Sequence, residues 1–338
     1  MEILTNFAVD NNAPPSMLRA IRQPIETDMA RFEEMRASVL SSPNPLLGLA
    51  LAHVASRQGK MMRPMLALLM GKAFNEQLDD EIMHAALALE LLHTASLVHD
   101  DVVDESDRRR GKASVNALFD NQAAVLVGDY ILSLALAEAA RTGSTHFVEA
   151  IAQLGQDLAD GELLQLHNMD LEEIAEEQYF DVIRRKTATL FATCCAATYI
   201  LHGEGASKDA LEQAHRLGDL IGIIFQMRDD IIDIVATDMA EKPAGNDLRE
   251  GKLTLPVIHA ITIDPSLTAA ALRVRRREAS ADDICSLTAA AVAHGIDYAN
   301  ARMETLIAEA HTIADNICTE NIATALHTYI DYVVQREK

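Results

Sequence analysis

The chain has 338 residues, of which 49% are hydrophobic and 24% are charged, a composition typical of folded globular proteins. Its formal net charge of −22 argues against general binding to nucleic acid or to anionic membranes. No apolar run reaches the roughly 18 residues of a membrane-spanning helix, and the N-terminus lacks the features of a signal peptide. We therefore expect no nucleic-acid partner, no transmembrane segment and a cytoplasmic location. No zinc-type spacing connects the cysteines, which we expect to be reduced thiols: Cys194, Cys195, Cys285 and Cys318.

Hydrophobic periodicity predicts an almost entirely helical chain. Residues 1–16 end in a Pro-Pro-Ser sequence and are predicted to form an extended or poorly ordered arm. Beyond them, apolar residues recur at i, i+3 and i+4. Residues 86–99 and 123–140 are apolar nearly all round, which is typical of central helices. Strand-like alternation is almost absent and no linker-like change of composition divides the chain. We predict one all-α domain over residues 17–338.

Two aspartate clusters follow apolar helical stretches: DDVVD at Asp100–Asp104 and DDIID at Asp229–Asp233. In a helix, the first and last residues of each cluster share a face about 6 Å apart, where two like charges are unfavourable without a cation. Oxygen ligands that leave room for water and phosphate suit Mg²⁺. A solvated acidic helix end is the alternative for one such cluster, but two matched clusters favour metal binding. The predicted metal ligands are Asp100, Asp104, Asp229 and Asp233.

Basic residues accompany the first cluster. Arg109 and Arg110 follow it closely, and guanidinium groups suit phosphate oxygens. Lys60 and Arg63 share a helical face at i, i+3, and His93 lies on the same helical stripe as the first aspartate. The alternatives are that the arginines only neutralise neighbouring aspartates and that the histidine is a core residue.

Further polar residues surround the second cluster. Lys186 and Thr187 open an apolar helix, and Gln226 lies on the carboxylate face three residues before the cluster. A loop from Lys242 to Lys252 carries Gly and Lys residues that suit bound phosphates, with a plain surface loop as the alternative. No nucleophile–base set, GxGxxG motif or P-loop occurs. The residues predict metal and cations that act on phosphate groups, without a covalent protein intermediate.

The ordered motifs GKMMRP, ELLHTASLVHDDVVDESDRRRG, VGDY, GELLQL, RRKTATLF, FQMRDDIID and GNDLREGKLTLP resemble those of the trans-polyprenyl diphosphate synthases over residues 45–260. Their identity, order and spacing all agree, so the resemblance is highly specific. It implies an all-α fold of the isoprenoid synthase type, a single large helical bundle with a central apolar cavity. It also implies a homodimer, about three Mg²⁺ ions, and isopentenyl diphosphate and an allylic diphosphate as the bound partners.

The resemblance assigns a role to each site residue. The allylic diphosphate ionises between the metals, the double bond of isopentenyl diphosphate attacks the allylic cation, and the departing diphosphate takes the proton. Contacts to the allylic diphosphate fall to Arg109, Lys186, Lys242 and, more weakly, Lys252, and contacts to isopentenyl diphosphate fall to Lys60, Arg63, His93 and Arg110. Thr187 and Gln226 orient the groups around the cation. The implied catalytic set is Asp100, Asp101, Asp104, Arg109, Lys186, Thr187, Gln226, Asp229, Asp230 and Lys242.

One motif departs from the family pattern. Members usually carry Gly-Gly-Lys-Arg before the x-Arg-Pro, whereas this chain has Gln58-Gly59-Lys60-Met61. The pair of Lys60 and Arg63 is kept, so binding of isopentenyl diphosphate is expected to survive with one cation fewer.

Product length depends on the depth of the apolar channel below the metals. Short-chain members close it with an aromatic residue four or five positions before the first aspartate, where this chain has Ser96 and Ala95, with Ala88 two turns below. We expect a product of about C30–C50, the range of quinone side chains, because small residues leave the helix face open. Closure by Tyr130 or Phe119 at about C20 is the alternative.

Three other functions remain open. A farnesyl or geranylgeranyl diphosphate synthase would share every motif and differ in channel depth. A terpene cyclase is disfavoured because such enzymes carry an Asn/Ser/Glu metal motif at the second site and lack the RRG sequence. A non-catalytic subunit of a heteromeric synthase is disfavoured because such subunits typically lose aspartates of the clusters, and none is lost here.

Overall fold

The structure is a computed structural model that describes residues 15–57, 59–109, 111–202, 207–235 and 245–336. It confirms the all-α prediction. The helices are α1 (Pro15–Arg22), η1 (Gln23–Ile25), α2 (Glu26–Val39), α3 (Pro45–Ser56), α4 (Met62–Phe74), α5 (Asp80–Val103), α6 (Val115–Phe119), α7 (Asn121–Arg141), α8 (Thr145–Met169), α9 (Glu176–Ile183), η2 (Arg184–Ala188), α10 (Thr189–His202), α11 (Lys208–Val235), α12 (Asn246–Arg249), α13 (Leu255–Ile263), η4 (Pro265–Leu267), α14 (Thr268–Arg275), α15 (Ala281–Ala290), η5 (Ala291–Gly295), α16 (Ile296–Ile317) and α17 (Glu320–Gln335). Two short strands, β1 (Arg108–Arg109) and β2 (Lys112–Ala113), form an antiparallel hairpin.

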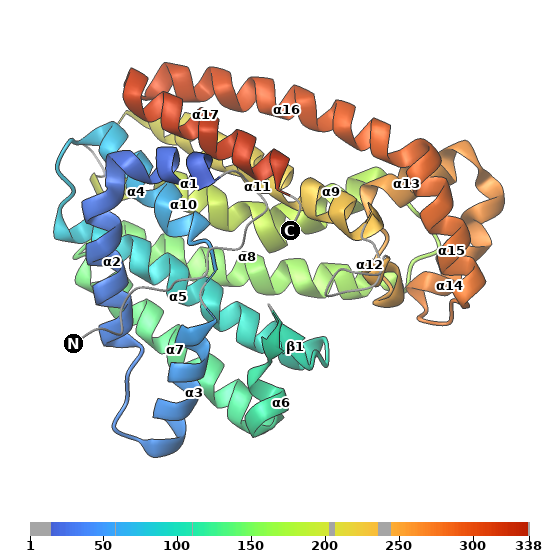
Figure 1. The fold of residues 1–338 in the computed structure, drawn as a ribbon, viewed down its shortest axis with the longest axis horizontal. Helices are drawn as coiled ribbons and strands as arrows, with labels where there is room; N and C mark the ends of the chain where they lie inside the picture. The colour runs from blue at the N-terminus through green and yellow to red at the C-terminus, as the bar shows by residue number, and fades with distance from the viewer. Residues whose placement is uncertain (1–14, 58, 110, 203–206, 236–244, 337–338) are drawn as a thin grey trace.

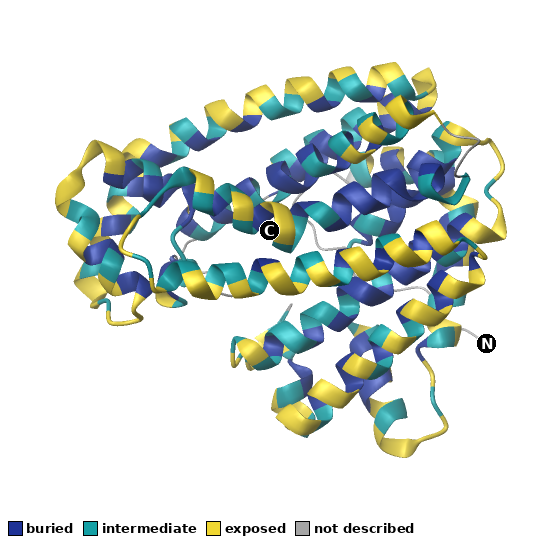
Figure 2. Ribbon diagram, turned by 180° about the vertical axis from the view of Figure 1, so that it is seen from behind, coloured by how far each residue is buried: buried dark blue, intermediate teal, exposed yellow. Residues whose placement is uncertain are grey.

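The helices form one bundle around a few central members. Helix α8 crosses the middle of the bundle, α16 and α17 lie along one side, and α3, α6 and α7 lie along the other (Figure 1). The central helices are predominantly buried, whereas α16 exposes residues along its outer side (Figure 2). This arrangement follows from the sequence, because helices that are apolar nearly all round are stable only when other helices cover them.

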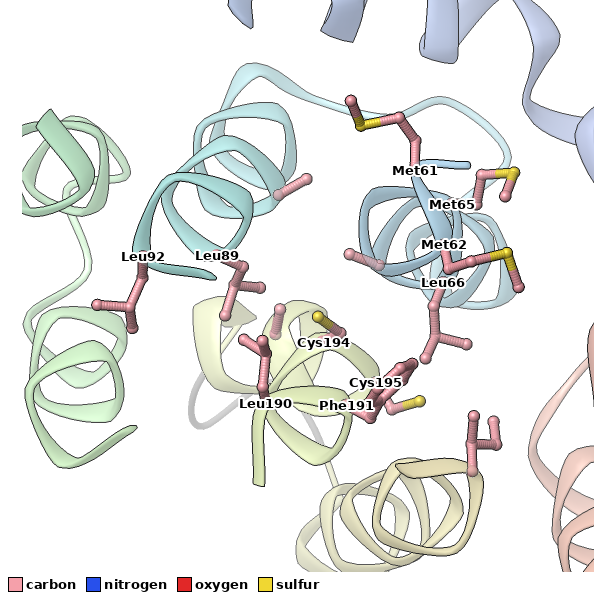
Figure 3. Packing of buried hydrophobic residues seen from close by; sticks show 14 of the residues in the cluster. Met61, Met62, Met65, Leu66, Leu89, Leu92, Leu190, Phe191, Cys194 and Cys195 are labelled. Atoms are coloured by element: carbon pink, nitrogen blue, oxygen red, sulfur yellow. The ribbon is translucent and has the colours of Figure 1, made fainter. Parts of the chain in front are cut away.

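The core relies on aliphatic and sulfur-containing side chains because the chain has no Trp and few other aromatics. Side chains from α4, α5 and α10 meet at the centre, among them Leu66, Leu89 and Leu190 (Figure 3). Cys194 and Cys195 are buried there, and all four cysteines of the chain are free thiols, as predicted. Small residues such as these allow close approach of helices.

Both aspartate clusters lie at the ends of long helices. Asp79 caps the N-terminus of α5 by accepting a hydrogen bond from the backbone N–H of Ile82, and the helix ends at Val103 with Asp104 as its C-cap. The DDVVD cluster therefore forms the last turn of α5. Helix α11 runs over 28 residues, and DDIID falls in its last turns. Each cluster is presented at the end of a helix whose preceding turns are buried.

Helix α1 begins at Pro15, so the last two residues of the predicted arm are helical, while residues 1–14 lie outside the described part. The expectation of no transmembrane segment was based on uninterrupted apolar runs. By length and composition alone, α5 and α7 are apolar enough to cross a membrane, with 67% and 39% of their most apolar windows buried in the bundle. The interior of the protein thus covers most of α5, and α7 keeps an exposed apolar side.

Candidate active site

The first cluster divides its carboxylates between an open face and the protein interior. Asp100 and Asp104 are half-buried on the last turn of α5, and Asp104 lies 3.8 Å from the Nζ atom of Lys252. Asp101 is only 1% exposed, and both of its oxygens accept hydrogen bonds from guanidinium groups: Oδ1 from Arg109 Nε at 2.6 Å and Oδ2 from Arg57 Nη2 at 3.2 Å. Asp101 therefore positions arginines, and the outer aspartates remain accessible to a cation.

The hairpin of β1 and β2 orients the basic sequence after the first cluster. Arg108 pairs with Ala113 and Arg109 with Lys112 across the hairpin, and Gly111 adopts φ +72° in the tight turn. This turn folds Arg109 back onto the end of α5. The neighbouring Arg110, predicted to bind isopentenyl diphosphate, lies outside the described residues.

The second cluster repeats this division. Asp229 has a side chain 42% exposed and forms an ion pair of 2.7 Å with Arg336. Asp230 is 2% exposed and accepts hydrogen bonds from Tyr179 Oη at 2.6 Å and Gln226 Nε2 at 2.9 Å. The second aspartate of each cluster, Asp101 or Asp230, thus binds protein groups, while the first aspartate remains at the open face.

Asp233, the last residue of the cluster, is held by the short helix α12. Its Oδ1 and Oδ2 atoms accept hydrogen bonds of 3.2 Å from the backbone N–H groups of Asn246 and Asp247. Asp233 therefore stabilises the first turn of α12.

Burial perturbs the acidity of the clusters. It raises the pKa of Asp100 to about 6, although the nearby ammonium group of Lys186 opposes this effect. It also raises the pKa of Asp230 to about 7, against the lowering effect of the hydrogen bonds from Tyr179 and Gln226. Carboxylates that hold protons this strongly are poorly compensated in the protein alone, and a cation at the open face would favour their ionised forms.

A short π-helical segment, η2, presents two predicted residues to the clusters. Lys186 forms an ion pair with Glu162 of α8, and Thr187 Oγ1 donates a hydrogen bond of 2.9 Å to Gln226 Oε1 on α11. π-Helical turns are rare and frequently occur at functional sites. The segment contacts both α8 and α11. Helix α11 approaches it closely at Gly222, where an added Cβ atom would lie 2.4 Å from Ala188 Cα.

A second group of cations lies at the N-terminal end of α4. Arg63 is half-buried, with its guanidinium carbon 4.6 Å from the ring centre of Phe191 and its Nη1 atom 3.0 Å from His93 Nε2. Lys60 Nζ lies 5.4 Å from the ring centre of Tyr332 on α17. Of the residues predicted to bind isopentenyl diphosphate, Arg63 and His93 are therefore in contact, and His93 lines a different cavity from Lys186.

The C-terminal helix contributes residues that sequence analysis missed. The Arg336 guanidinium stacks 3.6 Å from the ring centre of Phe225 and donates to the carbonyl oxygen of the same residue at 2.7 Å. Arg228 in turn holds the Arg336 carbonyl oxygen with two hydrogen bonds of 3.0 and 2.8 Å. No local motif marks Arg336, because its partners lie more than 100 residues earlier in the chain. Arg57 and Tyr179 were also missed, because their partners Asp101 and Asp230 lie 44 and 51 residues away on other helices, and Glu162 was missed because its partner Lys186 lies on η2.

Two cavities adjoin the clusters. One of about 170 Å³ lies beside the second cluster and is lined by Lys186, Thr187, Gln226, Asp230 and Lys252 together with apolar residues of α9 and α13. A smaller cavity of about 40 Å³ lies behind the first cluster and is lined by residues that include His93, Asp101 and Arg109. Lys252 connects the two clusters, since it lines the larger cavity and also pairs with Asp104. Lys242 lies outside the described residues.

The donor atoms suit Mg²⁺. Among the residues that the structure describes, no three His, Cys, Asp or Glu side chains form a ready-made metal cage. Mg²⁺ usually keeps several waters and takes one or two carboxylates together with substrate phosphates. The paired outer aspartates and the adjacent cations meet this requirement, and their oxygen-only chemistry does not suit softer metals.

Comparison with known proteins agrees with this geometry. Residues 44–291 match the family model described as Polyprenyl synthetase. The chain is 39% identical over 245 residues to an octaprenyl diphosphate synthase of Escherichia coli K12, in an alignment that covers 72% of this chain and 75% of the relative. The structure is similar to that of a decaprenyl diphosphate synthase from Rhodobacter capsulatus, with a TM-score of 0.86, 32% identity, and coverage of 95% of this chain and 99% of that one. It is also similar to a geranylgeranyl pyrophosphate synthase from Bacteroides thetaiotaomicron, with a TM-score of 0.83, 38% identity, and coverage of 95% and 100%.

An all-helical bundle with two aspartate clusters and two groups of cations defines an enzyme of isoprenoid biosynthesis that transfers prenyl groups. The chain belongs to the polyprenyl synthetase family. The predictions of the fold, of the family and of a prenyltransferase activity are confirmed.

Proposed function

We propose that the protein condenses isopentenyl diphosphate with an allylic diphosphate and produces a long trans-polyprenyl diphosphate. The observation that carries the proposal is the separation of two cation groups around the aspartate clusters. Lys186 and Lys252 line one cavity, whereas His93 lies on another and contacts Arg63. Two diphosphate subsites distinguish a two-substrate transferase from a hydrolase or a cyclase, which need only one.

Each group has a role in the reaction. Mg²⁺ held by Asp100, Asp104, Asp229 and Asp233 would stabilise the charge on the departing diphosphate. Arg109, fixed by Asp101, and Lys186 bind the allylic diphosphate and add to that stabilisation as the C–O bond breaks. The hydrogen bond from Thr187 to Gln226 orients their oxygens toward the allylic cation. Roles for Arg110 and Lys242 remain predictions.

The proton is lost without a dedicated protein base. Among the described residues that line the larger cavity there is no histidine, and the carboxylate of Asp230 is bonded to Tyr179 and Gln226. The departing diphosphate, held by Lys186 near the new C–C bond, is the base that the site retains. This assignment agrees with the absence of a nucleophile–base set in the sequence.

The predicted chain length of about C30–C50, suited to quinone side chains, rests on the face of α5 below the metals. Ala88 and Ala95 are buried, and Ser96 is half-buried with its hydroxyl group bonded to the carbonyl oxygen of His93 at 2.9 Å. Relatives of this chain named as octaprenyl and decaprenyl synthases support the same range. The relative named as a geranylgeranyl synthase keeps a C20 product as the alternative, with Tyr130 or Phe119 closing the channel.

The homodimer remains part of the proposal and is supported by an exposed apolar face on α7 and α8. Large apolar side chains with exposures from 36% to 65% lie there: Val125, Leu126, Leu136, Val148, Leu163 and Leu166. A face of this kind usually marks a protein–protein interface. Light scattering of the purified protein should give twice the 36.9 kDa of one chain, and Leu126→Glu should shift it toward the monomer. A cytoplasmic location is supported by the free cysteines.

One incubation tests the activity. Purified protein, Mg²⁺, farnesyl diphosphate and labelled isopentenyl diphosphate should yield a ladder of lengthened prenyl diphosphates that ends at a long product. Cyclised hydrocarbons would instead identify a terpene cyclase, and no turnover without another protein would identify a non-catalytic subunit. Asp100→Asn and Asp229→Asn should each abolish turnover while the circular dichroism spectrum stays helical.

A second substitution tests channel depth. Ser96→Phe places an aromatic ring on the face of α5 that carries Asp100, one turn below it. The ladder should then end at a shorter product, with the first condensation still efficient. A ladder of unchanged length would show that the channel does not pass Ser96.

A further inference from the structure

A small hydrophobic cluster beside the main core is formed by side chains of α11–α15 and η5. We call it the peripheral core, and its buried members are Ile234, Leu248, Val257, Ile261, Ala270, Ala271, Val274, Leu287 and Ala291. Helices α12, α14 and α15 lie together at one end of the bundle (Figure 1). Much of the peripheral core comes from the segment after Asp264, which lies beyond the family motifs.

The peripheral core supports contacts to both aspartate clusters. The backbone N–H groups of Asn246 and Asp247 on α12 bind Asp233, and Lys252, just after α12, lies 3.8 Å from Asp104. Helix α12 is itself anchored in the peripheral core by a buried leucine. The position of the peripheral core relative to the main bundle therefore affects groups that meet each cluster.

Arg275 connects the peripheral core to the wall of the active site. It is the last residue of α14, is 6% exposed, and follows Val274, a member of the peripheral core. Its Nη1 atom donates hydrogen bonds of 2.8 and 2.6 Å to the carbonyl oxygens of Leu171 and Glu173, and its Nη2 atom donates one of 3.2 Å to Gln178 Oε1. These acceptors lie in the connection between α8 and α9 and in the first turn of α9.

The three partners of Arg275 are neutral oxygen atoms. Burial lowers the pKa of Arg275, and no carboxylate of the described residues opposes this effect. The connection begins at the C-terminus of α8, where the helix dipole favours a cation. Ile174 in the same connection packs against both the main core and the peripheral core. The planar guanidinium group, with donors in fixed directions, therefore holds the connection in one position.

The connection leads into the helical run that carries predicted catalytic residues. Helix α9 continues without a break into η2, so this run includes Gln178, Tyr179, Lys186 and Thr187. At 1.5 Å per residue, Lys186 lies about 12 Å further along the run than Gln178. A shift at the first turn of α9 would therefore move the ammonium group of Lys186 and the hydroxyl group of Thr187 together.

We propose that Arg275 is a positioning residue that fixes the α8–α9 connection to the peripheral core and so holds Lys186 and Thr187 in place for ionisation of the allylic diphosphate. The inference deepens the proposed function and rests on it. Arg275 acts on the reaction through α9 and η2. Its loss should lower the rate of the chemical step much more than the affinity for isopentenyl diphosphate, whose predicted ligands Arg63 and His93 lie on α4 and α5.

Steady-state kinetics of Arg275→Gln test this assignment. A displacement of about 1 Å at a reacting centre can cost about a hundredfold in rate, so kcat should fall by about tenfold to a hundredfold. The KM for isopentenyl diphosphate should stay within about threefold of the wild type. Arg275→Lys should have an intermediate kcat, because both carbonyl oxygens are held by one nitrogen, Nη1, which an ammonium group can replace.

Hydrogen exchange measured by mass spectrometry gives a readout that does not depend on turnover. In Arg275→Gln, the amides of residues 176–188 should exchange faster than in the wild type, while those of α5 keep their protection. Thermal unfolding verifies that each variant is folded. Equal losses of protection in both segments would show a general loss of stability and would overturn the positioning role.

Arg276→Gln is the matched control. Arg276 pairs with Glu172 of the same connection at 3.5 Å, but its side chain is 53% exposed. Exposed ion pairs contribute little, so this variant should keep the kinetics and the exchange of the wild type.

Two kinetic results would also overturn the inference. In one, Arg275→Gln keeps the kcat of the wild type. In the other, it raises the KM for the allylic diphosphate without lowering kcat, which would make Arg275 a direct ligand of the substrate, since it also lines the larger cavity. If the wild type formed no prenyl product, the proposed function would fail, and the exchange of residues 176–188 would still decide whether Arg275 positions this run.

Discussion

Removing the hydroxyl group of Tyr179 tests the arrangement of the second aspartate cluster. This hydroxyl donates a hydrogen bond of 2.6 Å to Asp230, whose carboxylate is 2% exposed and has a second donor in Gln226. In Tyr179→Phe, the carboxylate loses one of these two donors and water cannot easily replace it. Hydrogen bonds to charged groups contribute about 1.5–3 kcal/mol, so we expect a loss of about 2 kcal/mol in the free energy of unfolding at pH 8.

The free energy of unfolding that Tyr179→Phe loses should be larger at pH 8 than at pH 5. Burial raises the pKa of Asp230 to about 7 in the folded protein, above the value of 3.8 expected when unfolded. The folded state therefore holds the proton more tightly, and this group reduces stability as the pH rises from about 4 to 7. Near pH 5 Asp230 is neutral, and a neutral hydrogen bond is worth only about 1 kcal/mol. The difference in the free energy of unfolding between Tyr179→Phe and the wild type should therefore be smaller at pH 5.

Tyr298→Phe provides a matched control. The Tyr298 hydroxyl group donates to Glu176 at 2.7 Å, but the glutamate side chain is 28% exposed and accessible to water. We expect this variant to lose less than about 1 kcal/mol and to keep full activity. Urea unfolding in EDTA at pH 5 and 8, together with turnover in Mg²⁺, would measure both effects. Equal losses in the two variants, or a loss for Tyr179→Phe that does not change with pH, would refute the reasoning.

Further predictions concern helix contact, metal and pH. Gly222→Ala would place a Cβ atom 2.4 Å from Ala188 Cα, so the π-helical segment must move. We expect the free energy of unfolding to fall by about 1–3 kcal/mol and turnover to fall at least about tenfold. Thermal unfolding and product formation would measure the two effects. Since burial raises the pKa of Asp100 to about 6, the metal-free protein should have a higher Tm at pH 5 than at pH 7, and Mg²⁺ should reduce that difference; a lower Tm at pH 5 would contradict this sign. Arg336→Gln removes the ion pair of 2.7 Å with Asp229, so Mg²⁺ no longer competes with the arginine for that carboxylate. The Mg²⁺ concentration needed to raise the Tm should therefore be lower than in the wild type. An unchanged Mg²⁺ titration of the Tm would show that the arginine does not compete with the metal.

Local regularities in the sequence were enough to predict the fold class and the aspartate clusters. The helical period is expressed within a few residues, and the spacing of Asp100 and Asp104 places both carboxylates on one helix face whatever the rest of the chain does. A functional group formed by residues close in the chain can therefore be predicted from the sequence alone. The prediction that Lys60 and Arg63 share a helical face was wrong, because α4 begins only at Met62 and Met61 adopts φ +54°, which leaves Lys60 outside the helix.

Only the tertiary structure decided which carboxylate of each aspartate cluster contacts which side chain. Asp100 and Asp101 are adjacent and chemically identical, yet one faces the open site and the other is buried between Arg57 and Arg109. Arg336 reaches Asp229 only because α17 packs back across the bundle. Such contacts join residues far apart in the chain, and no spacing rule specifies them. The sequence by itself determined the helices and the metal-binding chemistry, whereas the packing of the helices determined the two subsites, because only packing sets distances between separate elements.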